Sequence, residues 1–216
     1  MIALKRVQSS DVTLAIPRRN WTSGKYYDIY KDNYNGVTAG VNIDNGAGTT
    51  PATLFNANFF VVTDEYNVYK CIDNNNGGQS TTKPTGTGTT IISTADSYKW
   101  KYMYTVSPAD VLKFVSTDFI PVKKIITNPG STDPYYNQYL VEQAAVDGKI
   151  EHITVTNNGT SYASAPSITI TGDGTGATAD AVYDAGTNTV TGVTVTDGGS
   201  GYTCLLYTSD AADEED

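Results

Sequence analysis

The chain has 216 residues and a formal net charge of −9. It is long enough for one large or two small domains, and too acidic for general nucleic-acid binding, which needs clustered Lys and Arg. No apolar run approaches the roughly 18 residues that span a membrane. Lys5 and Arg6 stand where a signal peptide has its apolar core, so we expect neither a membrane-spanning segment nor an export signal. The 20 glycines and 16 tyrosines favour a mainly β protein with many turns.

Residues 2–17 are expected to form two short strands around a turn, the second strand being Val12–Ile16. Arg18, Arg19 and Trp21 follow, and interleaved basic and aromatic side chains of this kind can grip a polyanion. The alternative is a solvated loop whose Trp21 fills a gap in the core. The acidic remainder of the chain favours the loop.

Two apolar runs in the middle of the chain, Phe59–Val62 and Tyr66–Ile72, predict a pair of strands joined by a turn at Thr63–Glu65. Cys71 lies inside the second run and is interpreted as a small buried hydrophobic residue. With Cys204 as the only other cysteine, no disulfide framework is implied.

An Asn-, Gly- and Thr-rich loop of 18 residues, Asp73–Thr90, follows these strands. Loops of this length in compact domains are often functional. Asp73, Asn75 and Gly78 match the first, third and sixth positions of a calcium-binding loop. Pro84 occupies the twelfth position, where such a loop needs a bidentate Glu. We therefore predict no calcium site.

Aromatic side chains alternate with polar ones along Ser97–Thr105, which is a strong signal for a β-strand. The strand would bury a single face and expose Lys99 and Lys101. The buried face is predicted to consist of Tyr98, Trp100, Tyr102, Tyr104 and Val106.

A short helix is predicted from Ser107 to about Ser116. Ser107 is a suitable N-cap, Pro108 suits the first helical position, and Asp110 adds a negative charge to the first turn. The apolar positions of this helix are expected to be Val111, Leu112, Phe114 and Val115. An extended segment, Phe119–Val122, should follow, because Pro121 disfavours helix at the preceding residue.

Beyond Val122 the alternation of apolar and polar residues is weaker. In one interpretation, Lys123–Thr127 extends the strand predicted at Phe119–Val122. Tyr139–Val146 reads either as a weak helix or as a strand that crosses to the next domain. From Lys149 onward Thr, Gly, Val and Ala dominate, and a repeat begins.

The repeat aligns Ile153–Tyr162 with Val193–Tyr202 without gaps, at an offset of 40 residues (193 − 153), and five of the ten positions are identical. Each unit is expected to contain three or four short strands joined by Gly-rich turns, with Ser167–Thr171 as one of them.

No catalytic, cofactor-binding or metal-binding residue is predicted. His152 is the only histidine, which excludes sites with two histidine ligands and Ser-His-Asp relays within this chain. The carboxylates are scattered singly, and nothing marks a glycosidase-like pair.

The last thirteen residues, Cys204–Asp216, break abruptly with the preceding pattern. Back-translation of Cys204–Asp213 resembles the transposase mosaic end and adapter of sequencing libraries, read in frame. We therefore expect residues 204–216 to be adapter-derived rather than native, and the chain to be a metagenomic fragment.

Several segments resemble one family, the baseplate wedge subunit (the eighth-gene-product type) of contractile-tailed, myovirus-like bacteriophages. They occur in the same order as in that family and cover most of residues 4–122. The segments are Leu4–Tyr30, Val68–Gly78, Ser97–Tyr104 and Lys113–Val122.

The resemblance implies a non-enzymatic structural protein of the virion tail baseplate, assembled in the host cytoplasm. It also implies a homodimer that binds other baseplate wedge proteins and has no cofactor, nucleic-acid or membrane partner. The expected fold is mainly β: an antiparallel β-sandwich-like wedge domain with one short helix at 1–148, followed by a small Gly/Thr-rich β-repeat domain at 149–203. The alternative function is a host-surface, glycan-binding adhesin module like those of tail fibres, which would be a trimer.

Overall fold

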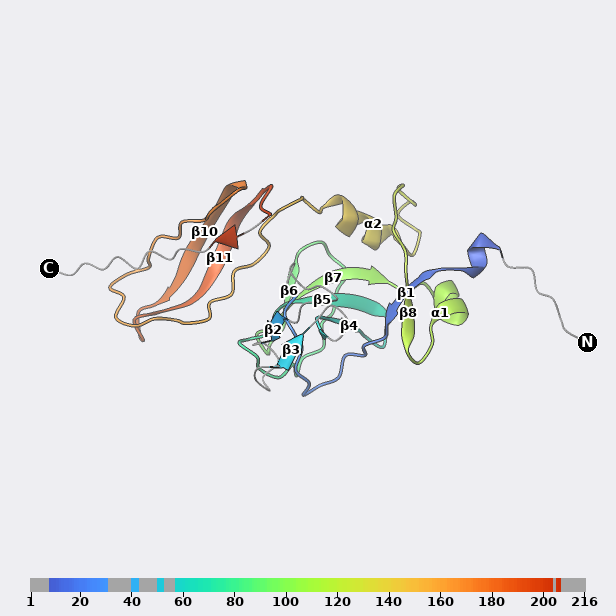
Figure 1. Cartoon of the computed structure of the whole chain (residues 1–216), viewed down its shortest axis with the longest axis horizontal. Coiled ribbons are helices and arrows are strands. Elements are labelled where there is room, and N and C mark those ends of the chain that lie inside the picture. Colours follow the sequence, from blue (N-terminus) through green and yellow to red (C-terminus); the bar gives the residue numbers. More distant parts are fainter. Residues whose placement is uncertain (1–7, 31–39, 43–49, 53–56, 204, 207–216) are drawn as a thin grey trace, which may run out of the picture. The chain divides into compact units, whose positions relative to one another are not determined.

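The computed structural model describes residues 8–30, 40–42, 50–52, 57–203 and 205–206 (Figure 1). The chain forms two compact units, Met1–Ala144 and Ala145–Asp216. It is mainly β with antiparallel sheets, as predicted. Residue 204 and residues 207–216 of the expected adapter-derived tail lie outside the described residues.

The first unit contains a four-stranded antiparallel sheet whose strands follow the spatial order β4, β5, β7, β6. The predicted strand pair is confirmed as β4 and β5, and the aromatic strand as β7. The bounds of these four strands are Phe60–Val62 (β4), Asn67–Asp73 (β5), Ile91–Ser93 (β6) and Lys99–Thr105 (β7).

Two smaller sheets hold the remaining strands that the structure describes in this unit. One pairs β1 (Leu14–Pro17) with β8 (Phe119–Val122), and the other pairs β2 (Gly40–Asn42) with β3 (Thr50–Ala52). A 3-10 helix, η1 (Ser9–Asp11), occupies the turn predicted before β1.

The four-stranded sheet is buried on both faces, by two separate hydrophobic clusters. The first cluster contains Tyr27, Val61, Tyr69, Cys71, Tyr98, Trp100, Tyr102 and Val141, with Trp21 and Ile92 packed against it. The second contains Val62, Val68, Tyr104, Val106 and Ile120, and Ile16 and Val122 pack against it. The β1–β8 sheet therefore faces the larger sheet across the second cluster, which is the sandwich-like part of the fold.

The prediction that all aromatic residues of β7 share one face is wrong beyond Tyr102. Val61 and Val62 are neighbours in β4 and must point to opposite faces, and they belong to different clusters. Tyr102 lies in the cluster of Val61, whereas Tyr104 lies in that of Val62. A register shift between β5 and β7 at this point adds one residue and reverses the alternation. Both tyrosines stay buried because each face of the sheet is covered.

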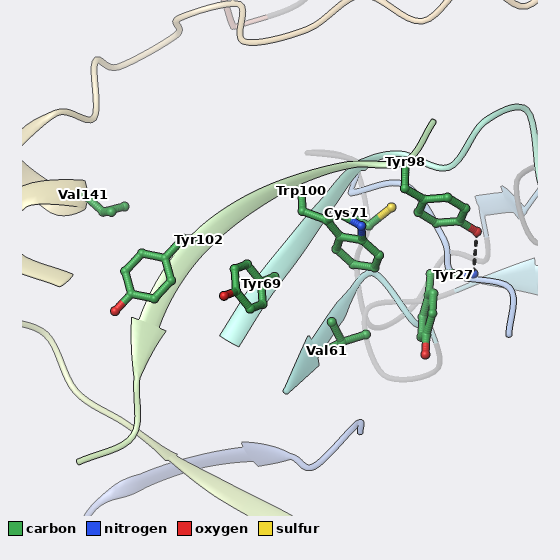
Figure 2. Close-up of a cluster of buried hydrophobic side chains, with 8 residues drawn as sticks. All are labelled: Tyr27, Val61, Tyr69, Cys71, Tyr98, Trp100, Tyr102 and Val141. Carbon is green, nitrogen blue, oxygen red and sulfur yellow. Dashed lines mark hydrogen bonds between the residues drawn. The ribbon is translucent and has the colours of Figure 1, made fainter. Parts of the chain in front are cut away.

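The first cluster is built around Trp100, which is fully buried (Figure 2). Tyr98 stacks on it with ring centroids 5.4 Å apart, and Tyr27 meets it edge-on at 5.6 Å. Such aromatic pairs add about 0.5–1.5 kcal/mol each beyond their buried area. Cys71 is fully buried in the same cluster, as predicted.

Helix α1 (Pro108–Phe114) begins as predicted, with the Ser107 side chain accepting a hydrogen bond from the Asp110 backbone N–H. It ends earlier than predicted because the Ser116 hydroxyl accepts from two following backbone N–H groups and forms a turn. Leu112 was expected to be an apolar contact, but it is 91% exposed. A helix of two turns packs only one of its faces against the core. On α1 this face is formed by Val111 and Val115, which contact the second cluster, so Leu112 points away from it.

The structure contains a second helix in this unit, α2 (Tyr136–Gln143), where the fold prediction allowed one short helix. It resolves the two interpretations of Tyr139–Val146 in favour of helix, displaced toward the N-terminus. Asp133 accounts for the earlier start, since its side chain and backbone carbonyl accept the N–H groups of Tyr135 and Tyr136.

The second unit is dominated by a hairpin of β10 (Thr175–Asp184) and β11 (Thr189–Ser200). The other two strands, β9 (Thr171–Gly172) and β12 (Leu205–Leu206), pair with each other. The second copy of the repeat lies on β11, but the predicted strands in the first copy and at Ser167–Thr171 do not form, apart from one bridge at Ser167 and the two residues of β9.

The first copy of the repeat lies beside β11 without forming a strand. Backbone hydrogen bonds to β11 join Ile150, just before this copy, to Gly198, and Asn158, within the copy, to Val190, each at 2.9 Å. Register shifts in the hairpin increase its twist, which works against a regular third ladder along this edge. Alternating sequence alone therefore does not give the first copy a paired strand.

The two copies nevertheless share the same turn. Asn157 and Asp197 each accept, through a side-chain oxygen at 2.9 Å, the N–H of the glycine two residues later. Those glycines, Gly159 and Gly199, have φ of +62° and +59°, a conformation that favours glycine. The identical glycines of the two copies thus mark a common turn, whereas the shared Thr-Val-Thr positions before it form a strand only in the second copy.

Candidate functional site

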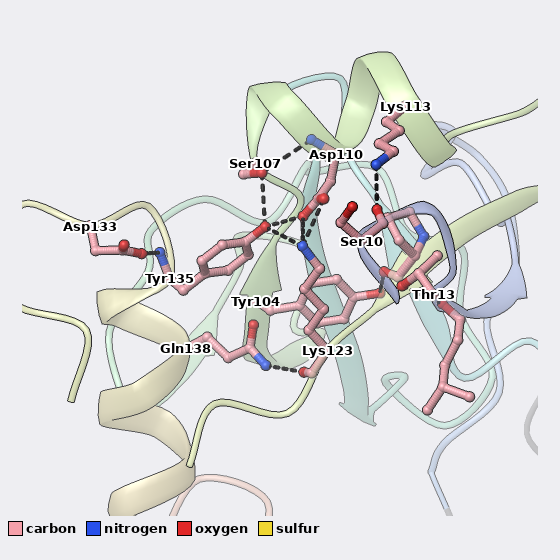
Figure 3. Close-up of polar contacts among 12 residues, drawn as sticks. Ser10, Thr13, Tyr104, Ser107, Asp110, Lys113, Lys123, Asp133, Tyr135 and Gln138 are labelled. Carbon is pink, nitrogen blue, oxygen red and sulfur yellow. Dashed lines mark hydrogen bonds and ion pairs between the residues drawn. The ribbon is translucent and has the colours of Figure 1, made fainter. Parts of the chain in front are cut away.

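A dense group of polar side chains in the first unit surrounds Asp110, on α1 (Figure 3). We call it the Asp110 clasp, and it joins α1, the chain after β8, and α2. Its members are Ser107, Asp110, Lys123, Tyr135, Gln138 and Glu142.

The centre of the clasp is an ion pair. Lys123 Nζ lies 2.7 Å and 2.6 Å from the two carboxylate oxygens of Asp110. Tyr135 donates its hydroxyl hydrogen to the same carboxylate and accepts a hydrogen bond from Lys123 at 3.0 Å. The Asp110 carboxylate is thus shared by a cation and a phenol from different segments.

Helix α2 is held to this centre mainly by polar contacts. Gln138 donates to the backbone carbonyl of Lys123, and the Glu142 carboxylate accepts the backbone N–H of Ile125 at 3.1 Å. The latter contact also explains why residues 123–127 do not extend β8. On the apolar side, Val141 packs into the first cluster.

The electrostatics of the clasp favour the charged forms of both partners. Burial alone would raise the pKa of Asp110, but hydrogen bonds from Lys123 and Tyr135 outweigh it and lower this pKa. Burial likewise opposes the charge of Lys123, but Asp110 and Tyr135 raise its pKa above the ordinary value. The pair therefore remains ionised over the whole physiological pH range.

The clasp is a structural device rather than an arrangement for catalysis. Its acid, its base and its phenol are bound to one another, and none is directed at an open cleft. The adjoining cavity has only about 10 Å³ of space for the centre of a water molecule. What the arrangement can do is fix α2 against α1 and β8.

The sequence did not identify this cluster. It marked Asp110 only as a first-turn acid, and it gave no role to Lys123 or Tyr135. No local spacing links these residues, since β8 and the loop before α2 bring them together.

The basic and aromatic residues after β1 make contacts within the protein, and the predicted packing of Trp21 is confirmed. Trp21 packs against the first cluster and donates its indole N–H to Ser80 at 3.1 Å. The Arg18 guanidinium donates to the carbonyl of Ser116 at 3.1 Å, and Arg19 lies over the ring of Phe60.

The calcium-like segment is a self-contained turn. Asp73 accepts the N–H of Asn75 at 2.9 Å, and the buried Asn74 side chain bridges the carbonyl of Tyr27 and the N–H of Gly77. Asn75, Asn76 and Gly77 all have positive φ. Within the described ranges, no group of three or more His, Cys, Asp or Glu residues could hold a metal ion.

The rest of the long loop is fastened by Asp96. Its carboxylate accepts the backbone N–H groups of Thr81 and Thr82 at 2.7 Å and 2.9 Å, and the Ser80 hydroxyl at 3.2 Å. Lys83 adds ion pairs to Asp64 and Glu65 in the turn between β4 and β5. The loop is therefore an ordered cover of the sheet.

Comparison with known proteins gives no match: no family model, curated protein or solved structure is similar to this chain. Among the helices that the structure describes, none is long and apolar enough to cross a membrane.

Proposed function

We propose that this chain is a structural virion protein of a contractile phage tail, a wedge-type subunit of the baseplate that acts by binding neighbouring wedge subunits. It is not an enzyme in this proposal. The observation that carries the proposal is the ordered resemblance of residues 4–122 to the baseplate wedge family.

The position of the resembling segments supports this proposal. Val68–Gly78, Ser97–Tyr104 and Lys113–Val122 contain most of β5 and β7, the end of α1 and all of β8. They supply much of the core of a single unit. The resemblance thus follows the central strands of one unit rather than scattered surface positions.

Exposed apolar side chains offer a surface for such partners. Leu112 on α1 is 91% exposed, Leu14 on β1 is 77% exposed, and Val12 is 65% exposed. Lys113 bonds to the carbonyl of Ser10 and lies 2.9 Å from Asp11, so α1 lies beside the segment that leads into β1. Protein interfaces bury apolar side chains of this kind at their centres.

Co-purification with neighbouring baseplate proteins from the same phage tests the proposal. The wild-type chain should form a complex, and Leu112→Lys with Leu14→Lys should weaken it at least tenfold. Val182→Lys is the matched control, because Val182 is an exposed apolar residue of β10, in the second unit. A chain that binds no baseplate protein would contradict the proposal.

The alternative, a glycan-binding adhesin, requires tyrosines free to stack on sugar rings. Tyr183 donates to the carbonyl of Tyr162 at 2.8 Å and Tyr202 accepts the N–H of Ala177 at 3.3 Å. The hydroxyls of these tyrosines hold the turns of the second unit together, which supports a structural role for them.

A further inference from the structure

A small cavity lies within the Asp110 clasp, between β7, α1, β8 and α2. Its polar lining includes Tyr104, Asp110, Lys123, Tyr135 and Gln138. About 10 Å³ is open to the centre of a water molecule, which is roughly the space that one water occupies by this measure. The cavity is thus too small for an organic ligand.

One acceptor in the lining has no partner. Gln138 is 5% exposed, and its amide nitrogen donates to the carbonyl of Lys123 and, at 2.7 Å, to the carboxylate of Glu142. Both partners are acceptors, which fixes the orientation of the amide. Its oxygen, Oε1, is buried and makes no hydrogen bond within the described part of the chain. Figure 3 shows the nitrogen end of the amide turned toward Lys123.

No neighbouring side chain of the described residues has a donor to spare. The three ammonium hydrogens of Lys123 go to the two Asp110 oxygens and to Tyr135. The hydroxyl of Tyr135 donates to Asp110, and that of Tyr104 donates to the carbonyl of Pro121 at 3.1 Å. The Oε1 atom of Gln138 therefore lacks a hydrogen-bond donor.

The hydroxyl groups at the edge of the cavity are also engaged. Because Tyr135 gives its only hydrogen to Asp110, Ser107 must donate its own hydrogen to Tyr135, at 2.9 Å. Thr105 donates to Asn67 at 2.6 Å. No rotation of these hydroxyls supplies Gln138 without breaking another bond.

We propose that the cavity binds a single water molecule as a fixed part of the clasp. The water donates one hydrogen to Oε1 of Gln138 and the other to an acceptor with a free lone pair, such as the Asp110 carboxylate. An ammonium ion has the right size and donors, but Lys123 already places a positive charge at this position. A neutral donor is therefore the ligand that the site selects.

The test is a crystal structure of the full chain at a resolution that defines ordered waters, together with water-to-protein cross-peaks measured by NMR in solution. We expect one water within hydrogen-bonding distance of the Gln138 oxygen, and a cross-peak from a long-lived water to the Gln138 side-chain amide. Gln138→Met should lose the ordered water in its crystal structure. Gln143→Met is the control and should retain both the water and the cross-peak, because Gln143 is an exposed glutamine at the end of the same helix.

Three results would overturn the proposal: a dry cavity in the wild-type chain, a Gln138 oxygen bonded to a protein donor, or an ordered water that remains in the crystal structure of Gln138→Met. The two wild-type measurements decide the question even if Gln138→Met does not fold.

Discussion

Replacing Asp110 by Asn tests the role of the clasp in stability, because the substitution keeps the size of the side chain and removes its charge. The variant loses the ion pair with Lys123 and one strong acceptor for Tyr135. Hydrogen bonds to charged groups contribute about 1.5–3 kcal/mol, and breaking a fully buried ion pair costs about 3–5 kcal/mol. The Lys123 side chain is 38% exposed and can turn toward water, so the lower figures apply. We expect a loss of about 2 kcal/mol in the free energy of unfolding.

Urea denaturation followed by tryptophan fluorescence measures this loss in the first unit, because both tryptophans, Trp21 and Trp100, lie in that unit. Asp118→Asn is the control. Asp118 is exposed, and substitutions at such positions change stability by less than about 0.5 kcal/mol.

The difference between wild type and Asp110→Asn should depend on pH. The pKa of Asp110 is lowered in the folded protein, relative to an ordinary value of 3.8. Its contribution is therefore fully present above the unfolded pKa and is lost as pH falls through the lowered folded value. The stability difference should be constant from pH 7 to about pH 5 and should shrink only in more acidic solution. Equal stability of the Asp110 and Asp118 variants at pH 7 would refute the reasoning.

Three further substitutions probe other parts of the fold. Trp100→Ala should cost about 3–5 kcal/mol by urea denaturation, because it empties the centre of the first cluster, whereas Leu112→Ala should change stability by less than about 0.5 kcal/mol; equal effects would contradict the assigned core. Asp96→Ala should increase amide hydrogen exchange at Thr81 and Thr82 at least tenfold without unfolding the sheet, because this carboxylate accepts both of these N–H groups; unchanged exchange would show that it does not fasten the loop. Gly199→Ala should disrupt the β10–β11 hairpin, because the added Cβ would collide with the carbonyl oxygen of Thr175, the first residue of β10, and because Gly199 has a φ of +59°. NMR signals of the hairpin residues that do not change in this variant would count against this turn.

The parts of the fold that were predictable depend on local chemistry. The alternation along β7 and the Ser107–Pro108 start of α1 are encoded by adjacent residues, and both were predicted from them. The change of face at Tyr104 was not, because it depends on how β7 aligns with β5. A register shift leaves no mark in the sequence of either strand.

The candidate site was not predictable for the same reason. Asp110 has an ordinary role as a first-turn acid, and its real partners, Lys123 and Tyr135, come from the chain after β8 and from the residue just before α2. In the first repeat copy the error is the opposite one, because the sequence predicts a structure that does not form. Its alternating residues predict a strand, but a strand also needs an edge that can pair with it regularly, and the twisted edge of β11 bonds to this copy at Asn158 and to the chain just before it at Ile150.

The central claim, a baseplate scaffold rather than an adhesin, is tested most directly by the mass of the purified chain in solution. Light scattering after size exclusion should give twice the mass of one chain, because the wedge family that the chain resembles is dimeric. A mass of three chains would contradict this account and indicate a fibre-like adhesin instead.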